Sequence, residues 1–255
     1  MRRPGITHSM SMAGCTLLAL TTTATLLLPG AASAQAKDYP LESVGGLRLH
    51  NVTAEPATLQ GKKGLRVTVS EEALRRLQGM APEERQQFRL DCLASVEELE
   101  FSNGVIEAEI AGAPAPGAQE GARGFVGVAF RVQKDMRTYD AFYLRPTNGR
   151  AEDQERRNHS AQYVSHPEWP WFRLRKETPS KYEAYVDLVA GAWTRIKVEV
   201  RGERARLYVH DHEQPTLIVN DVKSGANGKG AVALWIEPGT VAYFRNLTVG
   251  SLPTN

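Results

Sequence analysis

Cysteine is scarce in this sequence of 255 residues, which contains only Cys15 and Cys92. Cys15 lies in a segment that we expect to be removed, so the mature chain has no internal disulfide and must be held by its core. The sequence also lacks a phosphate-binding loop, a dinucleotide-binding glycine motif and a nucleophile elbow. No repeat of about 20–50 residues is visible, which argues against a propeller or a solenoid.

The sequence has no apolar run long enough to cross a membrane. The apolar run of residues 16–28 is shorter than the roughly 20 residues that a spanning helix needs. It follows two basic residues, Arg2 and Arg3, and precedes the small residues Ala32-Ser33-Ala34. This order is typical of a cleavable signal peptide. We therefore expect residues 1–34 to be removed and the protein to be secreted or periplasmic.

Net charge is also nearly absent from the expected mature chain. Residues 1–34 contain two arginines and no acids, so 31 − 2 = 29 basic residues face 29 acidic ones. A nucleic-acid partner would require a basic footprint, which this balance does not provide. The sequence thus indicates neither a nucleic-acid ligand nor a membrane span, and it does not fix the oligomeric state.

Short alternating strands fill most of the remaining chain, which predicts an all-β sandwich of two antiparallel sheets. We expect a lead-in segment over 35–44 and a single domain over 45–250. A helical insertion near 70–95 is predicted to hold one helix after Ser70 and a second over 82–95, with Cys92 in the core. Residues 111–123 are rich in Pro, Gly and Ala and predict a loop. Strands are predicted at 47–49, 64–69, 101–110, 124–132, 139–146, 160–166, 181–188, 193–200, 204–210, 216–220, 230–237 and 241–249.

Alternation along these strands separates two faces. In 124–132, one face holds valines and Phe130, while Gly127, Ala129 and Arg131 lie on the other. In 139–146 and 230–237 the second face likewise mixes small residues with Tyr143, Arg145 and Trp235. Small residues beneath large polar and aromatic ones predict a groove. The alternative is that a loop over 147–159, or the helical insertion, covers this face.

Four segments of the chain resemble the concanavalin A-like lectin/glucanase superfamily. They are Phe125-Val-Gly-Val-Ala-Phe-Arg131, Asp140-Ala-Phe-Tyr-Leu-Arg-Pro-Thr-Asn-Gly149, Gly230-Ala-Val-Ala-Leu-Trp-Ile-Glu-Pro-Gly239 and Phe244-Arg-Asn-Leu-Thr-Val249. Within it, the chain is most similar to exported bacterial domains of laminin-G-like or 3-keto-disaccharide hydrolase-like type. The resemblance covers most of the mature chain and implies a jelly-roll sandwich that holds a saccharide on its concave sheet.

Sugar binding requires aromatic rings for the apolar side of a pyranose and planar polar groups for its hydroxyls. The predicted centre consists of Tyr143, Arg145 and Trp235. The Trp-rich segment 166–171 predicts a stiff wall with exposed rings. The full set of predicted carbohydrate-binding residues is Arg131, Tyr143, Arg145, Asn148, Arg150, His159, Tyr163, Trp171, Trp235 and Glu237.

Hydrolysis would need two carboxylates at a set separation. The glucanase branch that the chain resembles uses Glu-x-Asp-x-Glu on one strand, but here Glu107 and Glu109 are followed by Ala111. We expect these two acids to form a solvated strand face instead. The other candidates for catalysis are His159, His166 and Glu168.

Metal binding is not indicated by the sequence. The segment 210–213 holds two histidines and two acids, but it reads best as a polar turn because no distant third ligand stands out. Calcium bound through backbone oxygens would fit a laminin-G resemblance, yet no acidic loop marks such a site.

Three functions remain open at this point. The first is binding of a carbohydrate on the concave face, as in a lectin. The second is hydrolysis of a glycoside in the manner of a keto-disaccharide hydrolase. The third is adhesion to a protein partner, as laminin-G-like domains often show. Resemblance of fold alone does not separate them.

Overall fold

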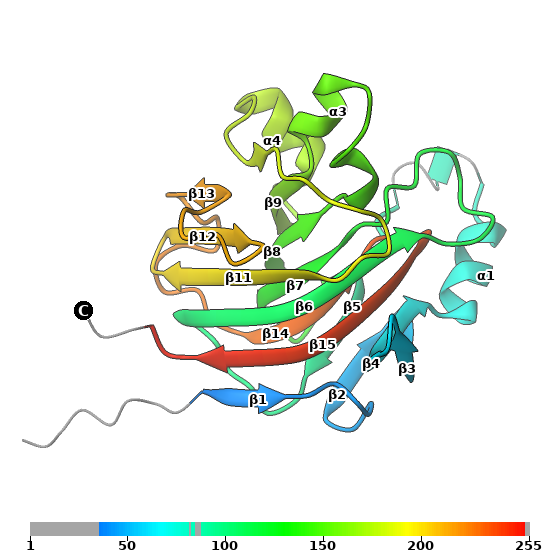
Figure 1. The fold of residues 1–255 in the computed structure, drawn as a ribbon, viewed down its shortest axis with the longest axis horizontal. Helices are drawn as coiled ribbons and strands as arrows, with labels where there is room; N and C mark the ends of the chain where they lie inside the picture. Colours follow the sequence, from blue (N-terminus) through cyan, green and yellow to red (C-terminus); the bar gives the residue numbers. More distant parts are fainter. Residues whose placement is uncertain (1–35, 82, 85–87, 253–255) are drawn as a thin grey trace, which may run out of the picture. The chain divides into compact units, whose positions relative to one another are not determined.

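Two antiparallel β-sheets face each other across the hydrophobic core (Figure 1). We describe them from a computed structural model that details residues 36–81, 83, 84 and 88–252. These residues form eight strands in one sheet and seven in the other, the jelly-roll β-sandwich that the sequence predicts. No described helix is long and apolar enough to cross a membrane. The predicted signal peptide lies outside the described residues.

Sheet A has the strand order β13-β12-β11-β6-β15-β4-β3, and β1 pairs with a further part of β15. Its long central strands, β6 and β15, stay paired from Thr240 opposite Pro114 to Gly250 opposite Val105, with one irregularity. The strands are β1 (Lys37–Tyr39), β3 (Val52–Leu59), β4 (Lys62–Val69), β6 (Gly104–Pro114), β11 (Thr194–Arg201), β12 (Arg204–Val209), β13 (Leu217–Val219) and β15 (Thr240–Gly250).

Sheet B has the strand order β10-β9-β8-β7-β14-β5-β2. Its three middle strands are the ones that carry the family resemblance. The strands are β2 (Leu47–His50), β5 (Cys92–Val96), β7 (Val126–Val132), β8 (Tyr139–Leu144), β9 (Ala161–His166), β10 (Glu183–Ala184) and β14 (Ala231–Ile236).

The inner face of sheet B supplies half of the core. Val128 pairs with Phe142 on one side and with Leu234 on the other, and all three are at most 1% exposed. Phe130 stacks on Phe142 with ring centroids 6.2 Å apart and meets Phe101 edge-on at 6.3 Å. Each such side chain contributes roughly 1.5–3 kcal/mol by leaving water.

The outer face of sheet B points away from sheet A. It carries the alternate residues of the same strands, among them Tyr139, Tyr143 and Trp235. Gly127 pairs with both Tyr143 and Trp235, and Ala129 pairs with Ala141 and Ala233. The predicted division into one apolar face and one mixed face is therefore confirmed for the middle of these strands.

The first predicted helix is present as α1 (Glu71–Gly79). Ser70 is its N-cap, and the Ser70 hydroxyl accepts a hydrogen bond from the Ala73 backbone N–H at 3.3 Å. Glu71 and Glu72 lie in the first turn, where the helix dipole favours negative charge. These signals explain why the helix begins where the sequence predicts.

The second predicted helix, over 82–95, is wrong at its C-terminal end. Residues 82 and 85–87 lie outside the described residues, but Cys92–Val96 form strand β5, which pairs with β14 and β2. All five residues of β5 are buried, so its sequence does not alternate between apolar and polar residues. Periodicity alone cannot distinguish such a short buried strand from a buried helix. Cys92 is in the core, as predicted, and Leu93 points to the opposite face.

Three short helical segments beside sheet B do not appear in the sequence-based prediction. They are the 3-10 turn η1 (Pro146–Asn148), α3 (Gln154–Asn158) and α4 (Trp171–Glu177). Figure 1 shows α3 and α4 together beyond β8 and β9. Asp153 caps α3 by accepting from the Arg156 backbone N–H at 3.2 Å. η1 and α3 replace much of the loop expected over 147–159. Of the strand expected over 181–188, only Glu183–Ala184 is a strand, β10.

Candidate functional site

Two aromatic rings lie against each other at the centre of the outer face of sheet B. Tyr143 and Trp235 stack with ring centroids 4.6 Å apart and an interplanar angle of 24°. Gly127 separates them along the sheet, and a Cβ there would lie 2.1 Å from the Phe142 carbonyl oxygen and 2.7 Å from the Tyr143 Cβ. Glycine at position 127 therefore lets the two rings meet. Both rings are only 3% exposed, so they form a floor rather than an open groove.

A hydrogen-bonded chain fixes the far side of this floor. The Trp235 indole N–H donates to the Tyr139 hydroxyl at 3.0 Å, and that hydroxyl donates to the Asp91 carboxylate at 2.8 Å. Arg89 donates to both oxygens of Asp91, at 2.8 and 3.0 Å. The buried Asp91 thereby orients two rings at once.

Arg145 lies beside the floor and is only 5% exposed. Its guanidinium donates to the Tyr143 hydroxyl at 2.9 Å, to the Gln162 side-chain oxygen at 3.2 Å and to the His159 backbone carbonyl at 2.9 Å. Three rings surround it within 6 Å of its Cζ, those of Phe125, Tyr143 and Trp171. The predicted contact of Arg145 with Tyr143 is thus present.

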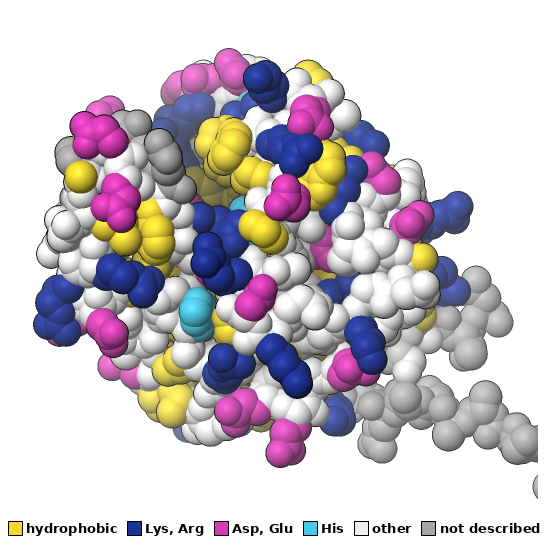
Figure 2. Space-filling view, turned by 180° about the vertical axis from the view of Figure 1, so that it is seen from behind, with side chains coloured by type: hydrophobic (Ala, Val, Ile, Leu, Met, Phe, Trp, Pro, Cys, Tyr) yellow, Lys and Arg dark blue, Asp and Glu magenta, His cyan; other side chains and the backbone are white. Residues whose placement is uncertain are grey.

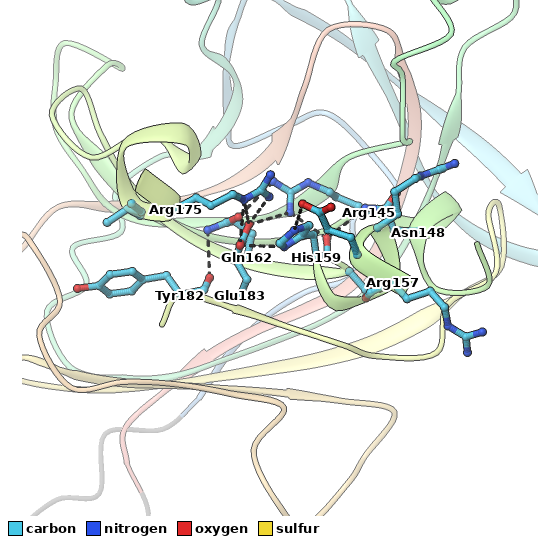
Figure 3. A network of polar contacts seen from close by, with 12 residues as sticks. Arg145, Asn148, Arg157, His159, Gln162, Arg175, Tyr182 and Glu183 are labelled. Carbon is cyan, nitrogen blue, oxygen red and sulfur yellow. Dashed lines mark hydrogen bonds and ion pairs between the residues drawn. The ribbon is translucent and has the colours of Figure 1, made fainter. Parts of the chain in front are cut away.

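Glu183 is the carboxylate around which the polar side of the site gathers (Figure 3). Arg175 Nε donates to it at 3.1 Å, Arg145 Nη1 lies at 3.8 Å, and His159 Nδ1 lies at 2.8 Å. The Glu183 side chain is only 3% exposed, so its charge requires these partners. Figure 3 also shows the Arg157 side chain pointing away from this network.

The imidazole of His159 is close enough to Glu183 to form an ion pair when protonated. Burial lowers the pKa of His159, and the nearby Glu183 carboxylate opposes that shift. Neither ring nitrogen makes an aligned hydrogen bond to a described residue. Because Nδ1 already lies against the Glu183 carboxylate, Nε2 is the nitrogen of His159 that can be offered to a ligand.

Further buried polar atoms without a described partner belong to residues of η1 and of α3, the helix that His159 caps. They are the Thr147 hydroxyl, the Asn148 side-chain oxygen and Arg156 Nε. Asn148 is 4% exposed, and its amide N–H donates to the same His159 carbonyl as Arg145, at 3.3 Å. Buried polar atoms in proteins are nearly always hydrogen-bonded to protein or water. Four residues with free atoms in one corner, between η1 and α3, therefore indicate a place where a ligand could bond.

Glu237 follows β14 directly and lies near Arg145 and Asp91 on the outer side. It keeps partial contact with solvent although protein surrounds it on most sides. Burial raises the pKa of Glu237 to about 7, against the effect of the Arg145 charge and together with that of Asp91. Among the described residues none donates a hydrogen bond to this carboxyl, so it can exchange protons near neutral pH.

Seen from behind, this side of the molecule is hollowed between the lobe that holds α1 and the lobe of α3 and α4 (Figure 2). Hydrophobic and basic side chains gather around the hollow. At the start of α4, Trp171 is 41% exposed and Phe172 is 61% exposed, and their rings meet edge-on. Because Trp171 also contacts Arg145, we place these exposed rings at the edge of the site. Trp171 has the exposed ring that the sequence predicts for 166–171, but it begins helix α4 instead of lying in a stiff loop.

Two predicted carbohydrate-binding residues, Arg131 and Tyr163, are instead on the inner side of sheet B. Arg131 has a left-handed backbone (φ 55°) at a point where the register between β7 and β14 shifts, and this turns its side chain inward. It is 1% exposed and bonds to backbone oxygens of Ser102 and Gly202. Tyr163 is fully buried and donates to Asp140 at 2.6 Å. Neither can reach a ligand on the outer face.

Three other predicted residues lie apart from the cluster around Glu183. Arg150 is exposed and forms a two-bond ion pair with Asp187, at 2.7 and 2.9 Å. Glu168 is an exposed carboxylate whose ion-pair partner is Arg173. His166 is at the far end of β9, whereas His159 is the C-cap of α3 before that strand begins. His159, His166 and Glu168, the three predicted catalytic residues, therefore do not form one catalytic site.

His166 nevertheless lies on the outer face, where its ring meets Tyr139 edge-on at 5.2 Å. Burial lowers the pKa of His166 to about 3, and the charge of Arg89 adds to this shift. The imidazole is thus neutral at physiological pH and cannot act there as an acid.

The remaining acidic and histidine candidates are on sheet A or its turns. Glu109 bonds to Lys62 and Asn246, as expected of a surface strand face. His210 and Asp211 have left-handed backbones in a turn, and His210 Nε2 lies 2.7 Å from the Asp187 carbonyl. Within the described part of the chain, no group of three His, Cys, Asp or Glu side chains is arranged to hold a metal ion.

Sequence reasoning missed Asp91, Arg156, Arg175 and Glu183. Glu183 and Arg175 stand in segments that were read as a strand and a loop, and nothing local marks their side chains as neighbours. Arg156 carries a usable signal, because it belongs to a basic run on a turn that directly follows the Asp140–Gly149 motif.

Comparison with known proteins gives likenesses of structure only. No protein-family model matches the chain, and no curated protein matches its sequence. A carbohydrate-binding module, CBM66 from Bacillus subtilis, is similar in structure at 14% identity and TM-score 0.49, over 80% of this chain and 98% of that one. Peanut lectin is similar at 9% identity and TM-score 0.49, over 88% and 100%. A β-glucanase from Bacillus licheniformis is similar at 12% identity and TM-score 0.44, over 88% and 100%.

Proposed function

We propose that this protein binds a saccharide in the hollow over the outer face of sheet B, as a lectin-like module. The observation that carries the proposal is the set of buried polar atoms with no described partner at Thr147, Asn148, Arg156 and His159. Hydroxyl groups of a sugar are both donors and acceptors, so they suit such a mixed set. Such atoms also occur at structural positions such as Asp140, so it is their gathering at four residues of one corner that supports the proposal.

The exposed rings at the edge of the hollow support the same proposal. Trp171 presents an apolar surface that is fixed by Arg145 and Arg175, whose Cζ atoms lie 5.9 and 4.8 Å from its ring centroid. A ring held in this way can stack against the apolar side of a pyranose at low entropic cost. The buried floor of Tyr143 and Trp235 would then act by holding Arg145 in place rather than by touching the sugar.

A glycan-array screen of the purified protein tests the proposal, followed by titration of every hit. Trp171→Ala should weaken binding about tenfold or more, since stacking rings at binding sites contribute of order 1–3 kcal/mol. Ile218→Ala is the matched control, because Ile218 is similarly exposed (47%) but lies on β13 of sheet A. Equal affinity of both variants would contradict the proposed site. Binding to a protein that free sugars do not displace would favour an adhesion module instead.

Glu237 favours a second candidate function, hydrolysis of a glycoside of the keto-disaccharide hydrolase-like kind. A carboxyl with a pKa of about 7 that faces a partly exposed site can donate a proton to a leaving oxygen at neutral pH. Product analysis on each array hit tests this candidate. Release of fragments by the protein, lost in Glu237→Gln with binding retained, would support it. If every glycan stayed intact, the result would contradict hydrolysis and leave saccharide binding as the function.

We further propose that the protein acts outside the cytoplasm, in line with the predicted signal peptide. Secretion of the full chain with loss of the first 34 residues, measured by N-terminal sequencing, would support export. A cell-retained chain with an intact N-terminus would contradict it.

A further inference from the structure

Arginine side chains crowd the corner between η1, α3 and the segment before β7. Burial lowers the pKa of Arg123, the positive charges of Arg156 and Arg145 lower it further, and the Glu120 carboxylate opposes this shift. The Arg123 carbonyl also accepts a hydrogen bond from the Thr147 backbone N–H at 3.3 Å. Three guanidinium groups therefore lie within electrostatic reach of one another beside the hydroxyl of Thr147.

The acidic residues nearby leave Arg123 and Arg156 without a described ion-pair partner, although Glu120 lies within electrostatic reach of Arg123. Glu183 is already shared between Arg145 and Arg175, with His159 also in contact. Arg123 donates only to the backbone carbonyls of Glu120 and Ala122, at 2.6 and 3.2 Å. No described carboxylate pairs with Arg123 or Arg156, and Arg156 Nε is buried without a described partner. A buried guanidinium N–H without a partner is costly, so this corner favours an incoming anion.

Free acceptors for hydroxyl groups lie beside the free donors. The Asn148 side-chain oxygen has no described partner, while its amide nitrogen is held by the His159 carbonyl. The Thr147 hydroxyl likewise has no described hydrogen-bond partner. A ligand that satisfies both the arginine donors and these polar acceptors carries an anionic group next to hydroxyl groups on one small ring.

We propose that the saccharide bound here is acidic and that its anionic group lies against Arg123 and Arg156, with ring hydroxyls at Asn148 and Thr147. This inference rests on the proposed binding of a saccharide and narrows its ligand class. The carboxylate of a uronic acid and the sulfate of a sulfated sugar share the required chemistry, since guanidinium groups bind both oxyanions with two parallel hydrogen bonds.

The test compares acidic oligosaccharides with their neutral counterparts by calorimetric titration of the purified full-length protein. The panel holds oligomers of galacturonate, glucuronate, mannuronate and guluronate and sulfated galactans, each beside its carboxyl-reduced or desulfated form. We expect binding to at least one acidic member, at least tenfold weaker binding to its neutral form, and affinity that falls as salt rises. The pair that responds distinguishes a carboxylate from a sulfate.

Two neighbours on α3 provide matched variants. Arg156→Gln should weaken acidic binding about tenfold or more, because it removes a charge-assisted hydrogen bond. Arg157→Gln should leave binding unchanged, because the Arg157 guanidinium bonds to the Tyr185 hydroxyl and points away from the network. Arg123→Gln serves as a second variant, and urea denaturation shows whether each protein is folded.

The outcomes separate this inference from the proposal beneath it. Equal binding of neutral and acidic forms, or equal effects of Arg156→Gln and Arg157→Gln, would overturn the acidic ligand and leave saccharide binding standing. No binding to any acidic or neutral glycan on the array would overturn both.

Discussion

Each face of sheet B carries a cluster of an arginine, a tyrosine and an acidic residue. The two clusters differ in how many of their polar atoms have a hydrogen-bond partner. On the inner side, Arg131 donates five hydrogen bonds, to Ser102, Gly202, Ser224 and Gly225. On the outer side, Arg145 is equally buried, but the polar atoms beside it remain without a described partner.

The comparison teaches that residue type does not separate a structural cluster from a binding one. Arg131 ties β7 to turns that belong to sheet A, so its bonds join the two sheets. The bonds of Arg145 stay within one corner of sheet B and hold a surface in shape. The two clusters differ in how many polar atoms lack a described partner: Asp140 Oδ2 on the inner side, against atoms of Thr147, Asn148, Arg156 and His159 in the outer corner. Substitutions on the two sides should therefore have different consequences.

Arg131→Ala should give the largest loss of stability. It leaves four partners unsatisfied in the interior, and breaking a buried charged network costs about 3–5 kcal/mol. Urea denaturation measures the free energy of unfolding. Arg150→Ala is the control, since its pair with Asp187 is exposed and screened by water and should contribute little. Similar losses in both variants would mean that Arg131 does not join the sheets.

Trp235→Ala should destabilise the protein by about 3–4 kcal/mol, because the ring is 3% exposed and leaves a cavity beside Tyr143. Because the ring is buried, the substitution should affect the fold as well as any binding. A loss below about 1 kcal/mol by denaturation would show that the ring is not packed as described.

Glu237 should make stability depend on pH. Its pKa in the folded protein is about 7, above the ordinary value of 4.5, so the folded state binds the proton more tightly. The free energy of unfolding should therefore fall as pH rises from 4.5 to 7 and level off above 7, by at most about 3 kcal/mol. Glu237→Gln should remove this fall. If the free energy of unfolding changed with pH in the same way in the wild type and in Glu237→Gln, the pKa of Glu237 in the folded protein would be near its ordinary value.

Trp171→Ala should have the smallest effect on stability, below about 1 kcal/mol, because the ring is 41% exposed. Set beside Trp235→Ala, it separates the ring offered to a ligand from the ring that forms the floor. A loss as large as that of Trp235→Ala would assign both tryptophans to the core and remove the exposed edge of the site.

Most of the fold could be predicted because alternation is strong in β7, β8 and β14. The prediction failed where alternation is absent, as in the fully buried Cys92–Val96, and where pairing is long-range. Lys37–Tyr39 and Val52–Leu59 are strands because they lie against β15 and β4, and their polar sequence gives no local sign of it.

The candidate site was predicted in part for a similar reason. Tyr143, Arg145 and Trp235 share a face by strand period, and the structure brings them into contact. Arg131 was misplaced because one left-handed residue reverses the direction that the period predicts. Glu183 could not be found, since its contacts with Arg175 and His159 depend on how α3 and α4 fold back over the sheet.

Cys92 gives this protein an internal reporter of its own opening. The thiol is fully buried between the sheets, and burial raises its pKa well above the ordinary value. An alkylating reagent needs an accessible thiolate, so it can react only in molecules where β5 has separated from β14 and β2. The rate of labelling of Cys92 in native buffer therefore reports how often the sandwich opens, without an engineered cysteine.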